Sequence, residues 1–289
     1  MPPIPPPRES GTTQTTDVPL YWCAYGPKPA PRLLVLHGGP GAHHDYLLPQ
    51  MLRLAEQRDV LFYDQRGGGR SKSDSRVPVT WQTQVEDLDR VIGEFGLDRL
   101  TLVGYSWGGL LAILYAIEGA EGRVAHNPSR LLLIDPAPVS RALRQQFETE
   151  FARRQSDPAI AQLRDELTAS GLRERDVDAY RQRAFELSVA GYFFDPRRAV
   201  DLTPFRVVGR VQQSVWDSLG GFDLTAPGRL DSVSVPTLIV HGREDPIPLA
   251  SSEAAARAMG AELVVLDACG HVPYVEQPDA LFAAVEGFL

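Results

Sequence analysis

Short apolar runs alternate with longer stretches of helical periodicity from about residue 30 to the C-terminus, and no other property of the sequence limits the fold as strongly. Apolar runs of this length are typical of strands buried on both faces of a sheet. The stretches between them carry apolar residues at helical spacing. The pattern predicts an α/β fold with a mostly parallel, doubly wound sheet. The expected strands are 33–36, 60–63, 100–103, 131–134, 237–240 and 263–266, and the expected helices are 80–95, 107–118, 250–259 and 279–288.

The alternation stops between residues 137 and 225, where the sequence becomes rich in Arg, Glu and Gln with apolar stripes at helical spacing. We interpret 137–225 as a helical cap inserted into an α/β core of residues 12–136 and 226–289. A cap at this point is expected over the carboxyl edge of the sheet, where open α/β folds bind ligands. Residues 1–11 are rich in proline and predict a flexible leader, and one or two edge strands are expected over 12–25.

Charge and composition exclude several classes of partner for this chain of 289 residues. A net charge of −8 provides no general basic surface for nucleic acid, and no apolar run reaches the length of a membrane helix. The two cysteines, Cys23 and Cys269, cannot build a disulfide framework, and the N-terminus has no signal-peptide core. We therefore expect a cytoplasmic protein that binds neither nucleic acid nor membrane.

The segment Gly104-Tyr105-Ser106-Trp107-Gly108 fits the pattern G-x-S-x-G between an expected strand and an expected helix. Small residues on both sides of a serine permit the tight turn that raises its hydroxyl above the sheet. An ordinary strand-to-helix turn is the alternative interpretation. The context of strand and helix favours Ser106 as a catalytic nucleophile.

A serine hydroxyl needs a base, and the base needs an orienting carboxylate. Asp245 and His271 lie in the loops after the last two expected strands, 237–240 and 263–266, so both should reach the same sheet edge as Ser106. The sequence thus predicts a catalytic triad of Ser106, Asp245 and His271. Glu244 is the alternative orienting acid, but the prolines around Asp245 fix its loop and favour Asp245.

The turn His37-Gly38-Gly39-Pro40-Gly41 follows the expected strand 33–36. A tetrahedral intermediate carries a negative oxygen that needs fixed N–H donors, and a glycine-rich turn can present them. We predict an oxyanion hole formed by the N–H groups of Gly39 and Trp107. A plain tight loop is the alternative.

Two other groups of residues have side chains that can bind a metal or act as a nucleophile. The adjacent pair His43-His44, followed by Asp45, resembles part of a metal site but lacks a third ligand nearby. Cys269 precedes His271 by two residues, but nothing in the neighbouring sequence would activate its thiol. We expect no metal and no organic cofactor.

Several blocks together resemble the proline iminopeptidase family of α/β-hydrolases over residues 20–136 and 225–289. The resemblance implies an α/β-hydrolase fold, a Ser106–His271–Asp245 triad, an oxyanion hole at Gly39 and Trp107, and a helical cap above the substrate. The blocks that carry it are His37-Gly38-Gly39-Pro40-Gly41, Tyr63-Asp64-Gln65-Arg66-Gly67, Gly104-Tyr105-Ser106-Trp107-Gly108-Gly109, Gly242-Arg243-Glu244-Asp245 and Gly270-His271-Val272-Pro273-Tyr274-Val275-Glu276. The Asp64 to Gly67 block is expected to be structural, with an Asp/Arg pair.

The chain departs from this family where the family binds the α-amine of its substrate. One acid usually follows the catalytic aspartate, but here that position is Pro246, and the second acidic region contains Gln212-Gln213-Ser214. A buried ammonium needs a counter-charge, so another acid should replace them. The candidates for substrate binding are three acids and three aromatic residues: Glu186, Asp217, Glu244, Phe193, Phe194 and Trp216.

Three functions remain open. The first is a serine hydrolase of the aminopeptidase type that releases N-terminal residues from short peptides or small amides. The second is a carboxylesterase with the same triad, and the third is a noncatalytic ligand-binding member of the fold. Haloalkane dehalogenase and epoxide hydrolase activities are disfavoured, because a chain that resembles those families would carry Asp at the position of Ser106.

Overall fold

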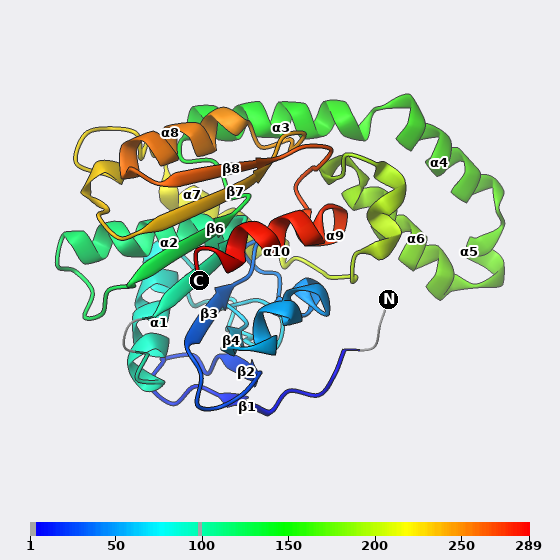
Figure 1. Cartoon of the computed structure of the whole chain (residues 1–289). Helices are drawn as coiled ribbons and strands as arrows, with labels where there is room; N and C mark the ends of the chain where they lie inside the picture. Colours follow the sequence, from blue (N-terminus) through cyan, green and yellow to red (C-terminus); the bar gives the residue numbers. More distant parts are fainter. Residues whose placement is uncertain (1–3, 98–99) are drawn as a thin grey trace.

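The computed structural model describes residues 4–97 and 100–289 and contains one eight-stranded sheet (Figure 1). The strand order is β1-β2-β4-β3-β5-β6-β7-β8. The first two strands are antiparallel to their neighbours, and all pairings from β4 onward are parallel. The predicted α/β fold is confirmed. The strands are β1 Glu9–Thr12, β2 Tyr21–Tyr25, β3 Arg32–Leu36, β4 Asp59–Tyr63, β5 Thr101–Tyr105, β6 Arg130–Ile134, β7 Thr237–Gly242 and β8 Glu262–Leu266.

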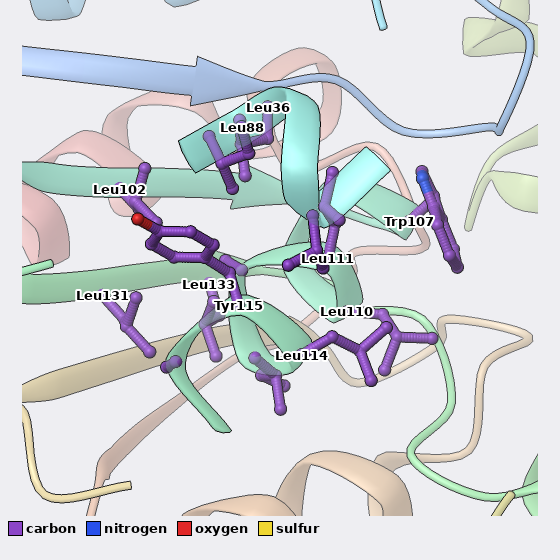
Figure 2. Close-up of a cluster of buried hydrophobic side chains, with 14 of the residues drawn as sticks. Leu36, Leu88, Leu102, Trp107, Leu110, Leu111, Leu114, Tyr115, Leu131 and Leu133 are labelled. Atoms are coloured by element: carbon purple, nitrogen blue, oxygen red, sulfur yellow. The ribbon is translucent and has the colours of Figure 1, made fainter. Parts of the chain in front are cut away.

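Helices cover both faces of the sheet, because alternate residues of each central strand face opposite sides. In β6, for example, Leu131 and Leu133 belong to one buried cluster, and Leu132 and Ile134 belong to the other. Figure 2 shows the first cluster, in which Leu88 and the apolar face of α2 pack on the strands. The core helices are η1 His44–Leu47, η2 Gln50–Glu56, α1 Trp81–Glu94, α2 Trp107–Ala120, η5 Leu230–Ser232, α8 Leu249–Met259, α9 Pro273–Glu276 and α10 Pro278–Glu286.

A helical segment connects β6 to β7, and its helices before η5 lie within the range 137–225 expected for a cap. An isolated bridge pairs Ser140 with Asp223, so the segment leaves and rejoins the sheet region at one point. In Figure 1 its middle helices, α4 to α6, lie to the right of the sheet. The elements are α3 Arg141–Gln155, α4 Pro158–Ala169, α5 Leu172–Arg175, α6 Val177–Val189, η3 Ala190–Tyr192, η4 Pro196–Asp201 and α7 Gly209–Leu219.

The predicted leader over residues 1–11 is wrong from Glu9 onward. Glu9–Thr12 forms β1 and pairs with β2, with Glu9 opposite Ala24 and Gly11 opposite Trp22. The open edge of β2 provides backbone groups for this pairing, and a Cβ on Gly11 would lie 3.3 Å from the Trp22 ring. Residues 1–3 of the predicted leader lie outside the described residues.

Candidate active site

Ser106 occupies a strained turn between β5 and α2. Its backbone has φ 54° and ψ −118°, a region that residues with a side chain rarely adopt. A Cβ at Gly104 would lie 2.5 Å from the carbonyl oxygen of Gly108, and a Cβ at Gly108 would lie 2.1 Å from that of Leu36. The two glycines of the G-x-S-x-G pattern are therefore required by the close packing of this turn.

The neighbouring strand end fixes the same turn from the other side. The Ser106 N–H donates to the carbonyl of Ile134 at 3.0 Å, and the Ala137 N–H donates to the carbonyl of Ser106 at 2.9 Å. The backbone of Ser106 is thus bound to the loop after β6, while its side chain stays partly exposed.

The three predicted triad residues lie in hydrogen-bonding contact. Ser106 Oγ is 3.0 Å from His271 Nε2, and His271 Nδ1 is 2.7 Å from Asp245 Oδ2. Asp245 follows β7 and His271 follows β8, as the sequence predicted. With Nδ1–H donating to Asp245, Nε2 is free to accept the serine proton.

Burial controls the charge of the imidazole and of the carboxylate. It lowers the pKa of His271 to about 4, so the imidazole is neutral at neutral pH. Burial raises the pKa of Asp245, although the Ile247 N–H, which donates at 2.7 Å, and the neighbouring Asp135 both act to lower it. The dry surroundings thus keep His271 in the form that accepts a proton.

Glu244, the alternative orienting acid, has a different contact. Its Oε2 accepts a hydrogen bond from the Cys269 N–H at 2.9 Å, and its backbone carbonyl accepts one from Arg154. Glu244 therefore supports the loop that precedes His271, and the carboxylate beside the imidazole belongs to Asp245.

The glycine-rich turn after β3 lies against Ser106. A Cβ on Gly38 would lie 2.7 Å from the Ser106 Cβ, and Gly39 has φ 60°. The Gly38 N–H donates to Tyr46 Oη at 2.7 Å, whereas the Gly39 N–H has no hydrogen-bond partner within residues 4–97 and 100–289. Trp107 is the first residue of α2, where an N–H has no acceptor within its own helix. Both predicted oxyanion donors thus come from backbone that is close to Ser106 in sequence or in space.

Gln65 connects this turn to the loop after β4. Its backbone N–H donates to His37 Nε2 at 3.0 Å, its side-chain amide donates to the His37 carbonyl at 2.8 Å, and its Oε1 accepts from Trp107 Nε1 at 3.0 Å. The structural role expected for the Asp64 to Gly67 block fits these contacts. The expected pair within it does not form, because Arg66 binds Asp87 at 2.5 and 2.7 Å.

Three residues whose roles the sequence pattern does not indicate hold the His271 loop. The Tyr192 carbonyl accepts from the His271 N–H at 2.7 Å, and its ring lies 5.1 Å from the imidazole. Tyr105 Oη donates to the His271 carbonyl at 2.8 Å, and Glu276 accepts from the Gly270 N–H at 2.7 Å. Tyr105 and Glu276 lie inside sequence blocks that carry the family resemblance, but no spacing rule assigns them these partners.

The six candidate substrate-binding residues do not meet in one cavity. Phe193, Phe194 and Glu244 line a cavity of about 320 Å³, and Trp216 and Asp217 line another of about 250 Å³. Ser106 lines neither of the two.

Glu186, the remaining candidate, lines neither of these cavities. It is buried, and its carboxylate accepts from Gln182 at 3.0 Å and from Arg183 at 2.7 Å. Its charge is therefore already balanced by a neighbour on the same helix.

Asp135, His241 and Asp245 bring possible metal ligands within 4.8 Å of one another, and no other such group occurs within residues 4–97 and 100–289. Both ring nitrogens of His241 are engaged, Nε2 with the Ile247 carbonyl at 3.1 Å and Nδ1 with Ser252 at 3.0 Å. Neither nitrogen of His241 is therefore free to bind a metal ion. The adjacent pair His43-His44 is not part of this group.

Comparison with known families identifies the fold family. A family model described as the alpha/beta hydrolase family matches residues 33–285, which is most of the chain. The chain belongs to this family. Within the described part of this alpha/beta hydrolase, no helix combines the length and the apolar character needed to cross a membrane.

Relatives of this alpha/beta hydrolase carry the name expected from the sequence. It is 27% identical over 268 residues to a proline iminopeptidase of Lactobacillus delbrueckii subsp. lactis, covering 85% of each chain. It is also 27% identical over 301 residues to a proline iminopeptidase of Saccharolobus solfataricus, covering 97% of this chain and 92% of the relative. The crystal structure of a Mycobacterium smegmatis proline iminopeptidase matches with a TM-score of 0.69 at 23% identity over 97% of each chain. The predicted resemblance to proline iminopeptidase-like α/β-hydrolases is confirmed, and membership in a hydrolase family follows.

Proposed function

We propose that this hydrolase is a serine hydrolase that works through an acyl-enzyme and releases N-terminal residues from short peptides or small amides. One observation carries the proposal. Ser106 Oγ lies 3.0 Å from a buried imidazole whose other nitrogen lies 2.7 Å from Asp245. The names of the relatives support the choice of peptide substrates.

In the proposed reaction, Ser106 Oγ attacks the carbonyl carbon of the substrate while its proton moves to His271 Nε2. Asp245 accepts the hydrogen bond of Nδ1–H and stabilises the imidazolium that forms. The N–H groups of Gly39 and Trp107 bind the negative oxygen of the tetrahedral intermediate. The intermediate collapses when Nε2–H gives its proton to the leaving amine, which leaves an ester on Ser106. Water then releases the acyl group by the same proton transfers.

A second candidate function, carboxylesterase activity, is favoured by the state of the candidate amine-binding acids. Glu186 is bound by Arg183, Glu244 accepts from the Cys269 N–H, and Asp217 accepts from Gln213 at 2.7 Å. An amine would therefore have to compete with existing partners. An ester substrate needs no such anchor.

The test is parallel turnover of proline β-naphthylamide, its N-acetylated form and a short-chain p-nitrophenyl ester. We expect the free-amine substrate to react fastest, because a carboxylate of the enzyme offsets the cost of burying its ammonium. Faster hydrolysis of the N-acetylated amide or of the ester would replace the aminopeptidase proposal with the esterase.

Variants of the candidate acids test which of them binds the amine of the substrate, beginning with the cavity of about 250 Å³ that Asp217 lines. Asp217→Asn should raise KM for the free-amine substrate and leave the ester unchanged. Glu148→Gln is the matched control, since Glu148 lines the same cavity but pairs with Arg144 at 2.9 Å. Glu186→Gln and Glu244→Gln are measured in the same way, and an unchanged KM in all three test variants would contradict an acidic anchor among them.

A further inference from the structure

A second buried carboxylate lies behind the predicted triad. Asp135 directly follows β6, Asp245 follows β7, and the two side chains bring oxygen atoms within 4.8 Å of each other. Asp135 is 0% exposed and Asp245 is 6% exposed. The Asp135 backbone has φ 42°, a costly conformation for a residue with a side chain. The fold thus tolerates both strain and the burial of a second acid at this point.

The two oxygens of Asp135 differ in their partners. Oδ1 accepts from the Gly242 N–H at 2.8 Å. Oδ2 is buried and accepts no hydrogen bond from any residue within 4–97 and 100–289. A buried carboxylate oxygen without a donor is costly, and two ionised carboxylates in contact are more so. One proton between the two acids removes both costs.

The proton belongs on Asp135. Burial raises the pKa of both carboxyl groups, and their interaction with each other raises the pKa of Asp135 further while it lowers that of Asp245. Asp245 also accepts from the Ile247 N–H, which favours its ionised form. Asp135 has only one backbone donor and an orphaned oxygen.

We propose that Asp135 is a protonated positioning residue that donates a hydrogen bond to Asp245 and keeps that carboxylate ionised beside His271. The proposal rests on the catalytic role proposed above for Asp245. It also connects two parts of the site, because Ile134, directly before Asp135, and Ala137, two residues after it, bind the backbone of Ser106.

Other titratable groups surround this acid pair. His241 on β7 lies 3.6 Å from Asp135, and His271 contacts Asp245. The positive charge of Arg154 on α3 lowers the pKa of Asp245. A pH profile of the pair is therefore read against a fixed set of neighbours: Tyr105, His241, Cys269, His271, Tyr274, Tyr192, Glu276, Glu244 and Arg154.

The experiment compares Asp135→Asn with Asp135→Ala in the full chain. The asparagine can donate to Asp245 and accept from Gly242, so its kcat should stay within roughly threefold of wild type, since the hydrogen bond is kept. The alanine removes the donor, and kcat should fall roughly 10- to 100-fold with KM nearly unchanged. Its acid limb should move to higher pH, because Asp245 and His271 then hold protons more tightly.

Two further measurements do not depend on turnover by the variants. One detects the proton on Asp135, and the other tests the proposed function separately. Infrared spectroscopy of wild type against Asp135→Asn should show the loss of one buried protonated carboxyl band. Fluorophosphonate labelling of Ser106, measured in wild type, tests the triad separately.

Three results would overturn the proposal. They are an Asp135→Asn variant as impaired as Asp135→Ala, an Asp135→Ala variant with the wild-type pH profile, and a wild-type infrared spectrum without the carboxyl band. A label that maps away from Ser106 would instead contradict the proposed function.

Discussion

Within the part of the chain that the structure describes, two sets of nucleophile, imidazole and carboxylate have nearly equal hydrogen-bond distances. In the first, the two hydrogen-bond distances are 3.0 and 2.7 Å, and in the second they are 3.1 and 2.7 Å. The first is the Ser106 triad, made of Ser106, His271 and Asp245, and the second is the Cys23 cluster, made of Cys23, His44 and Asp64. Spacing alone does not distinguish them.

Their surroundings do distinguish them. Ser106 is partly exposed on a strained turn beside free backbone N–H groups, whereas Cys23 lies within β2 and is 1% exposed. Burial raises the pKa of the Cys23 thiol to about 12, so the thiolate is absent at neutral pH. Asp64 also accepts from the backbone N–H groups of His44 and Arg70. A hydrogen-bonded triad becomes a candidate site only where substrate and anion donors can reach the nucleophile.

Removing the two nucleophiles in turn should give the largest difference in kcat between the Ser106 triad and the Cys23 cluster. Ser106→Ala should lower kcat by roughly 10⁴- to 10⁶-fold, and adding His271→Ala should cost little more, because the two act as one unit. Cys23→Ala should leave kcat within roughly twofold of wild type and lower the free energy of unfolding by about 1–2 kcal/mol through lost packing and one hydrogen bond. Turnover and urea unfolding check both. A large kcat loss in Cys23→Ala would erase the distinction.

Replacing the carboxylates of the two sets should have equally different effects, on kcat for Asp245 and on stability for Asp64. Asp245→Asn should keep the fold but leave the imidazole in the wrong tautomer, with a loss of roughly 10⁴ in kcat. Asp64→Asn should destabilise the fold by about 1–3 kcal/mol, because it weakens the acceptor of buried donors, with little change in kcat per folded molecule. Glu244→Gln is the control for the first variant. Greater damage from Glu244→Gln would make Glu244 the orienting acid.

The pH dependence should report the Ser106 triad alone. Because burial lowers the pKa of His271 to about 4, the imidazole stays neutral through the usual range of histidine titration. A neutral base is required, so kcat/KM should stay level as pH falls to about 5 and then fall roughly tenfold per pH unit below the pKa of His271. Cys23→Ala should give the same profile. A limb centred near pH 6.5, the ordinary value for histidine, would show that His271 is hydrated in solution.

Thiol chemistry should show the smallest effect. Cys23 and Cys269 are both buried, and burial raises the pKa of each thiol. Ellman's reagent should therefore leave the native protein and its activity unchanged and should react with both thiols in guanidinium chloride. Rapid reaction of a native thiol together with inactivation would place a cysteine near the site.

The sequence predicts the positions of residues that directly follow the strands, because the order and direction of the strands can be inferred from the apolar pattern. Ser106, Asp245 and His271 each follow an apolar strand of a parallel sheet, so their meeting at one edge follows from topology. The Cys23 cluster could not be predicted, because it depends on how a 3₁₀ helix packs on β2. The sequence around His44 indicates only a possible metal pair with His43.

Packing between elements also limited the prediction of substrate contacts. Pairing partners such as Arg183 for Glu186, or Asp87 for Arg66, follow from the placement of neighbouring side chains. The strain at Asp135 arises where β6 meets the loop, and no composition or spacing indicates it.

The most direct test of the account is the site of covalent labelling by a fluorophosphonate probe. The probe reacts only with a serine whose hydroxyl is activated and reachable, the two properties that separate the Ser106 triad from the Cys23 cluster. Peptide mapping by mass spectrometry should find one adduct, on Ser106, and none in His271→Ala. An adduct on another residue, or an unlabelled but fully active enzyme, would contradict the account.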